Sequence, residues 1–183
     1  MGVWAIEEPL LASEPRKSAM GQLDREAVLT DQHYRDCAWI RERSPIPLIA
    51  DESLISMRSL EAIISYSAFD ILNVRLSKVG GIDNATRMVQ LANEHGLRFY
   101  IGAMVGESPV LATMGSHFAA VHTDHLAVQG HSHKILHRGS MTRGEPRMRR
   151  GGVLELRPEP GLGIELIPQA LDAFTEHRSV VRP

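Results

Sequence analysis

Hydrophobic residues along this chain alternate between short continuous runs and longer stretches in which they recur at helical spacing. The continuous runs have the length of buried strands and are flanked by polar or turn-forming residues. Strands are therefore predicted at 3–7 (VWAIE), 46–50 (IPLIA), 70–75 (DILNVR) and 98–102, with a further candidate at 124–128. Strands that alternate with helices are typical of βα units in a parallel sheet.

Helices are predicted between these strands. In 54–66 (LISMRSLEAIISY) apolar residues recur near a period of 3.6, so one face of this helix should be buried. A second helix is predicted over 83–95, with Asp83 as its N-cap and Gly96 directly after its end. A third, over 108–121, carries Pro109 in its first turn, where the missing N–H costs nothing.

Two regions depart from this alternation. Residues 12–43 are longer than a βα connection needs, and they indicate a mobile loop followed by a helix over about 22–42. This insertion is a candidate lid or a protein-interaction element. From 140 onward the chain has short β-like pieces and a final helix near 168–177, typical of an appendage to a layered core.

Bulk composition narrows the class of protein. The 183 residues are 43% hydrophobic with a net charge of −2, so we expect a globular protein without a nucleic-acid partner. The basic stretch at 143–150 (RGEPRMRR) fits a solvated loop better than a binding patch. Cys37 is the single cysteine, which excludes an intrachain disulfide and favours a role as core filler in a reducing cytoplasm. No apolar run approaches the roughly 20 residues that span a bilayer, so no membrane partner is expected.

Charged residues stand at three successive strand ends. Glu7 and Glu8 end the first strand, Asp51 and Glu52 follow the second, and Arg75 ends the third, with Lys78 just beyond. Carboxyl ends of parallel strands meet at one edge of the sheet, which is where ligands bind in α/β folds. Carboxylates that converge there are suitable ligands for Mg²⁺. The alternative is that Asp51 or Glu52 caps the helix that follows.

Five motifs occur in the order found in the enolase superfamily. They are WAIEEPL, PIPLIADESLIS, FDILNVRLSKVGGIDNATRMVQLANEHGL, GAMVGESPVLATMGSHFAA and PGLGIEL. The chain resembles the carboxyl-terminal part of the mandelate racemase and muconate lactonizing enzyme group, from strand four onward. This resemblance implies an α/β fold, the C-terminal portion of a (β/α)₇β TIM-type barrel. The barrel is incomplete in this chain, because closing it takes about eight strands. Residues 1–139 would form the partial barrel, and 140–183 a tail that packs against it and an absent capping domain.

The resemblance also implies a chemistry. In this group Mg²⁺ grips a substrate carboxylate and stabilises the enediolate formed when an α-proton is removed. By motif match the metal ligands are Glu7 and Asp51, with Glu8 and Glu52 as supporting acids. The third ligand and the Lys-x-Lys signature of the second strand lie outside this sequence, so we expect the chain to be incomplete alone.

The candidate catalytic residues depart from the family pattern. Arg75 stands where lactonizing enzymes and dipeptide epimerases carry a second lysine, and an arginine keeps its proton, so it suits charge stabilisation better than proton transfer. Lys78 matches a family lysine that is usually structural. Glu107 resembles an acid after strand seven in a less characterised subgroup. Gln129 stands where related sequences tend to have an acid.

Histidines gather in one stretch of the chain. The five are His122, His125, His131, His133 and His137. They suggest a transition-metal site, but no matching set of acids or thiols lies nearby, so a surface or capping-domain contact is the favoured interpretation. His117 lies among apolar residues of a predicted helix, as a satisfied core histidine would.

Two hypotheses for function follow. The first is a Mg²⁺-dependent enzyme part of acid-sugar dehydratase, racemase or epimerase, or cycloisomerase type, acting on a small carboxylate. The second is a non-catalytic truncated remnant that serves as an interaction or oligomerisation module. Under either, the open edges at 3–7 and 124–128 need cover, so we expect a homo-oligomer or a complementing N-terminal half. The substrate is left open.

Overall fold

The computed structural model describes residues 2–10, 16–17, 23–24, 29–128, 139–175 and 179. The chain divides into two compact units. Unit 1 comprises Met1–Gly102 and Asp124–Gln129, and unit 2 comprises Ala103–Thr123 and Gly130–Pro183. The predicted domain boundary at 139/140 stays a prediction; in this division residues 103–123 group with the C-terminal segment.

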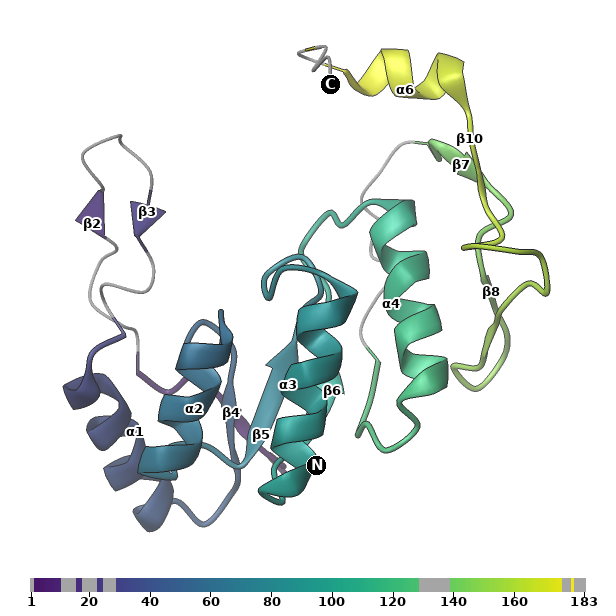
Figure 1. Ribbon diagram of the computed structural model, residues 1–183. Coiled ribbons are helices and arrows are strands. Elements are labelled where there is room, and N and C mark those ends of the chain that lie inside the picture. The colour runs from purple at the N-terminus through teal and green to yellow at the C-terminus, as the bar shows by residue number, and fades with distance from the viewer. Residues whose placement is uncertain are drawn as a thin grey trace. The chain divides into compact units, whose positions relative to one another are not determined.

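Unit 1 is built on a parallel sheet with the order β1-β4-β5-β6 (Figure 1). Its strands are β1 (Ile6–Glu7), β4 (Leu48–Ala50), β5 (Ile71–Val74) and β6 (Arg98–Ile101). Each lies within a predicted strand and is shorter than predicted. Between 124 and 128 the structure has a single parallel bridge, from Val128 to Ile101, in place of a fifth strand. All residues of β4 and β5 are buried, as expected for the central strands of a parallel sheet covered on both faces.

Unit 1 has three helices, which overlap the predicted helical segments but begin at other residues than predicted. They are α1 (Asp31–Arg43), α2 (Met57–Tyr66) and α3 (Ile82–Glu94). Leu60 and Ile63 of α2 are fully buried, which confirms the predicted apolar face. Ser56 caps α2 and forms a capping box with Ser59. The alternative that Asp51 or Glu52 caps this helix is therefore wrong, because a turn separates β4 from the first residue of α2.

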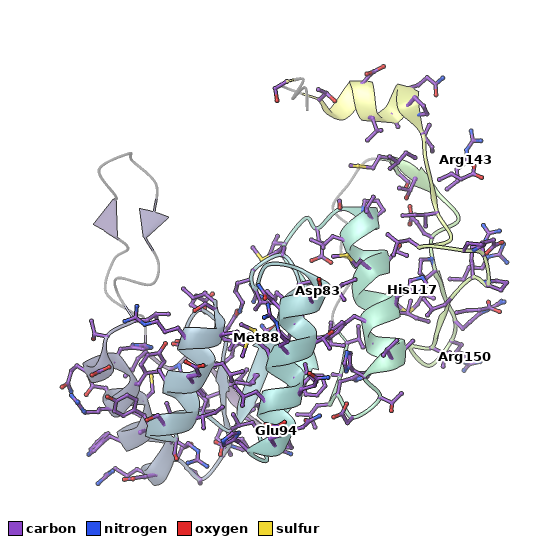
Figure 2. The ribbon with its side chains drawn as sticks, in the orientation of Figure 1. Asp83, Met88, Glu94, His117, Arg143 and Arg150 are labelled. Atoms are coloured by element: carbon purple, nitrogen blue, oxygen red, sulfur yellow. The ribbon has the colours of Figure 1, made fainter. Side chains whose placement is uncertain are left out.

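The N-cap predicted for α3 is also wrong. Gly81 occupies the N-cap position, and the helix begins at Ile82. The φ of Gly81 is 100°, a value that glycine adopts readily and other residues rarely do. Asp83 lies instead in the first turn, where its charge still favours the helix dipole. Figure 2 shows Asp83 and Glu94 near opposite ends of α3, with Met88, which is fully buried, between them. Gly96 follows the helix with φ 69°, as predicted.

The insertion is described only in part. It contains a short antiparallel pair, β2 (Arg16–Lys17) with β3 (Leu23–Asp24). The helix predicted from about residue 22 begins at Asp31, with Thr30 as its N-cap. The remainder of the predicted loop lies outside the described residues, so a lid stays a prediction.

Unit 2 holds one longer helix and several short pieces. They are α4 (Pro109–Val121), β7 (Thr142–Arg143), β8 (Arg147–Met148), β9 (Leu154–Glu155), β10 (Glu165–Leu166) and α6 (Pro168–Phe174). β7 pairs with β10, and β8 with β9, both antiparallel. Pro109 lies in the first turn of α4, as predicted, and Ser108 is the N-cap of this helix. Within the described ranges, no helix combines the length and the apolar character needed to cross a membrane.

The basic stretch and His117 both belong to unit 2. Figure 2 marks Arg143 and Arg150 on the C-terminal segment and His117 on α4. Within the stretch, Arg149 forms an ion pair of 2.6 Å with Glu155 of the β8–β9 pair. His117 is half-buried, with its Nε2 atom 3.3 Å from the backbone oxygen of Leu162, so it is satisfied but lies outside the core.

Candidate active site at the carboxyl end of the sheet

One face of the sheet in unit 1 changes from apolar to polar along the strands. Ile49, Ile71 and Tyr100 form a small buried cluster on that face, with Ala5 packed against it. Side chains two residues apart along a strand share a face. The residues two positions after Ala5, Ile49 and Ile71 therefore lie above this cluster at the strand tips; they are Glu7, Asp51 and Asn73. The fold thus brings the two predicted metal ligands to the same edge of the sheet.

Asp51 is buried and both of its carboxylate oxygens face cations. Arg75 Nη2 donates to Oδ2, and Lys78 Nζ donates to Oδ1 over 2.6 Å. Lys78 Nζ also donates to the backbone oxygens of Asp51, over 2.6 Å, and of Asn73, over 3.2 Å. All three N–H donors of Lys78 thus have acceptors, and the side chain ties the turn after β5 to the tip of β4. Burial lowers the pKa of Lys78, while Asp51 opposes that shift.

Glu7 is exposed and is oriented by neutral donors. Its Oε1 atom accepts hydrogen bonds from Asn73 Nδ2 at 2.8 Å and from the Tyr100 hydroxyl at 2.7 Å. Arg75 Nη2 lies 3.9 Å from the same oxygen. Glu7 and Asp51 therefore face one guanidinium group. Burial and the hydrogen bond to Glu7 raise the pKa of Tyr100, which keeps its hydroxyl a donor.

Glu8 follows Glu7 with a left-handed backbone, φ 41°. Its Oε2 atom accepts from the backbone N–H groups of Asp51 at 2.8 Å and Ser53 at 3.2 Å, and Oε1 accepts from the Ser53 hydroxyl. Burial raises the pKa of Glu8, and these hydrogen bonds oppose the rise. A strained backbone at a side chain with several defined partners is typical of functional positions. The contacts fit the supporting role predicted for Glu8.

The Ser53 hydroxyl links this strand tip to α1. Its Oγ atom lies 2.6 Å from His33 Nε2, and the Cys37 sulfur lies 3.7 Å from the same nitrogen. Burial lowers the pKa of His33 and raises that of Cys37 to about 12, so neither group is charged near neutral pH. The fully buried Cys37 is core filler, as predicted. The network attaches the helix that follows the insertion to the tips of β1 and β4.

Gly102, directly after β6, leaves room for the side chains of Asn73 on β5 and of Arg75 just after it. A Cβ atom at this position would lie 1.9 Å from Asn73 Oδ1 and 2.9 Å from Arg75 Cγ. Gly102, Asn73, Tyr100, His33 and Ser53 were not among the site residues predicted from the sequence. The available signal was the presence of Asn73 and Tyr100 inside otherwise apolar strands, where a buried polar group needs a partner.

Other candidate residues are not shown to join this site. Glu52 is exposed. Glu107 lies in unit 2, where its buried carboxylate accepts from the backbone N–H of Met104 at 3.0 Å. Gln129, His131, His133 and His137 lie outside the described residues. His122 packs on Phe118, with ring centroids 4.3 Å apart. In the part of the chain that the structure describes, no three His, Cys, Asp or Glu side chains form a group that could hold a metal ion.

Comparison with known proteins identifies the family. The model for the family described as enolase C-terminal domain-like matches residues 1–170. An L-Ala-D/L-amino acid epimerase of Pedosphaera parvula is 35% identical over 100 residues, 55% of this chain and 28% of that protein. An N-succinyl-L-Arg/Lys racemase of Bacillus cereus is 32% identical over 147 residues, 79% of this chain and 38% of that protein. The chain thus spans well under half of the length of these relatives.

Solved structures agree with this result. The crystal structure of the Bacillus cereus N-succinyl Arg/Lys racemase has a TM-score of 0.78 and 28% identity, and covers 98% of this chain and 42% of that one. A dipeptide epimerase from Cytophaga hutchinsonii, complexed with Mg and the dipeptide D-Ala-L-Val, has a TM-score of 0.71 and 26% identity, over 79% of this chain and 39% of that one. By sequence and by fold, the chain belongs to the enolase C-terminal domain-like family and forms a C-terminal portion of its α/β barrel.

Proposed function

We propose that this chain is the C-terminal barrel part of a racemase or epimerase that acts at a carbon next to a carboxylate. Relatives of this type support the reaction class, and the chain covers only part of each. The observation that carries the proposal is that Glu7 and Asp51, from adjacent strands, face the same cationic group. Of the three reaction types considered from the sequence, racemisation or epimerisation is the one that the curated relatives favour.

The donor chemistry at this edge fits a divalent cation. Glu7 and Asp51 supply hard carboxylate oxygens, the ligand type that Mg²⁺ prefers. Both already share a cation, Arg75, so their oxygens are directed to a common region. Mg²⁺ held by these two residues would supply positive charge that stabilises an enediolate. Two protein carboxylates give weak binding, which we expect on the order of millimolar.

The surrounding residues have positioning roles in this proposal. Asn73 and Tyr100 orient the Glu7 carboxylate, and Glu8 fixes the backbone of Asp51 and Ser53. The guanidinium group of Arg75 would stabilise negative charge. Lys78 uses its donors within unit 1, so its proposed role is to hold the strand tips, and Glu107 stays a candidate from unit 2.

We also propose that the free side of β1 is covered by a further strand, from a second copy or from the rest of an enolase-type barrel. Among the described residues, β1 is an edge strand, and Val3, Trp4 and Ile6 are 71%, 62% and 37% exposed. Exposed apolar residues at an unpaired strand favour association. Light scattering of the purified chain should show a dimer or larger species, and a clean monomer would contradict this.

The metal proposal is tested by thermal unfolding with increasing MgCl₂. At a Mg²⁺ concentration ten times Kd, the stabilisation is about 1.4 kcal/mol, or an upward shift in Tm of about 3–6 °C. Glu7→Gln and Asp51→Asn should each abolish the shift. Glu94→Gln should keep the Tm shift, because it alters an exposed carboxylate at the C-terminal end of α3 (Figure 2). If both site variants responded like the parent chain, the ligand assignment would be wrong.

A further inference from the structure

Arg75 occupies the region between the two carboxylates that a shared metal ion would need. Its Nη2 atom contacts Asp51 Oδ2 and lies 3.9 Å from Glu7 Oε1. The side chains of Arg75 and Asp51 are 19% and 4% exposed, so little water screens the contact between them. The Cγ atom of Arg75 would be 2.9 Å from a Cβ at Gly102, so the aliphatic part of Arg75 passes close over that backbone. The guanidinium group is thus held at the strand tips by packing as well as by charge.

Two cationic side chains face the two candidate metal ligands at this edge. Lys78 and Arg75 together neutralise Asp51 and Glu7, and Lys78 contacts Asp51 alone of these two carboxylates. If Arg75 lost its charge, Glu7 would face no cation among the described residues and would keep the neutral donors Asn73 and Tyr100. A dication would then be attracted to the pair, whereas with Arg75 in place it meets a like charge at contact distance.

We propose that Arg75 is a built-in competitor for the divalent cation: its guanidinium takes the cation position shared by Glu7 and Asp51, and metal binds only as Arg75 moves away from Asp51. This inference rests on the proposed function, since it requires Glu7 and Asp51 to be the metal ligands. It makes Arg75 a positioning residue that sets how strongly this edge of the sheet holds a metal ion. Low metal affinity would then result from competition by Arg75 as well as from the small number of protein ligands.

The test measures metal affinity on the full 183-residue chain. Mn²⁺ is titrated by electron paramagnetic resonance and Mg²⁺ by calorimetry, with the parent chain, Arg75→Met and Arg75→Lys. We expect Arg75→Met to tighten Mn²⁺ binding by at least about tenfold, because a repulsive unit charge near a partly buried dication is removed. Arg75→Lys should tighten it by a smaller factor, because an ammonium group lacks the span of the guanidinium fork. If circular dichroism shows that Arg75→Met does not fold, the comparison is made with Arg75→Lys instead.

The matched control is Arg87→Met on α3. Arg87 is exposed and donates to Asn84 on the same helix rather than to Glu7 or Asp51, so its removal should change the affinity less than twofold. A second measurement follows the Arg75 Nε–H signal by ¹⁵N nuclear magnetic resonance in the parent chain. Added Mg²⁺ should shift this signal and leave that of Arg87 in place.

The outcomes separate this inference from the proposed function. If Glu7→Gln and Asp51→Asn abolish binding while Arg75→Met binds like the parent, the competition is refuted and the ligand pair stands. An Arg75 signal that does not move when Mg²⁺ binds also refutes the competition. If Glu7→Gln and Asp51→Asn bind like the parent, or if neither the parent nor Arg75→Met binds metal, both proposals fail. Binding by Arg75→Met alone supports both.

Discussion

Substitution of Gly102 by alanine is expected to disturb the whole strand-tip site. The new Cβ would lie 1.9 Å from Asn73 Oδ1 and 2.9 Å from Arg75 Cγ, against an ordinary contact of about 3.4 Å or more. Asn73 has to move by more than 1 Å, and it cannot do so without weakening its 2.8 Å hydrogen bond to Glu7. The change therefore affects Glu7, although Gly102 carries no side chain of its own.

The expected loss of stability is about 1–3 kcal/mol, the usual cost of overpacking a buried site. For a chain of this length, that lowers Tm by about 2–12 °C. Because the nearest clash is with the Asn73 side chain, much of the cost should depend on that side chain. In an Asn73→Ala background, Gly102→Ala should cost less by roughly the size of the clash, which a double-mutant cycle measures.

Urea unfolding followed by circular dichroism provides the four stabilities of this cycle. Gly2→Ala is the matched control, since a Cβ at Gly2 would meet no atom within 4 Å. The reasoning is refuted if Gly102→Ala is as stable as the parent chain. An equal cost of Gly102→Ala with and without the Asn73 side chain would refute it as well.

Two further predictions concern the network at α1. His33→Gln should reduce the pH dependence of stability. Burial lowers the folded-state pKa of His33, so below about pH 6.5 the unfolded state binds a proton that the folded state does not. The contribution of His33 to stability should therefore be complete above about pH 6.5 and be lost as the pH falls below it. If the free energy of unfolding changed equally with pH in parent and variant between about pH 7.5 and 5.5, this prediction would be contradicted. Ser53→Ala should destabilise the chain by about 1–3 kcal/mol in urea, because the buried Glu8 carboxylate loses its hydroxyl donor; a loss below about 0.5 kcal/mol would show that water or the backbone N–H groups compensate.

The predictable part of the site was the part encoded by local sequence. Glu7 and Asp51 directly follow apolar runs, and the carboxyl end of a parallel strand faces the same edge as its neighbours. Helix ends were harder, because the chain between β4 and α2 makes a turn before Ser56 caps the helix. That turn depends on Glu8, which holds the backbone of Asp51 and Ser53 from another strand.

The residues missed were those whose role depends on register across strands. Asn73 and Tyr100 are direct partners in the pairing of β5 with β6, which brings both to Glu7. One sequence does not specify that register, because several alignments of two short apolar strands bury similar surface. His33 was missed for a similar reason, since its contact with Ser53 depends on how α1 packs.

The hydrogen bonds from Asn73 and Tyr100 to Glu7 join residues 66 and 93 positions apart. Ordering such long segments carries an entropic cost that is recovered only when all four strands are in place. A sheet without β5 and β6 could pair β1 with β4, but Glu7 would lack its hydrogen bonds from Asn73 and Tyr100, so an ion that bridges Glu7 and Asp51 would favour the completed sheet. Metal titration of this chain would therefore report on the last stage of its folding as well as on its chemistry.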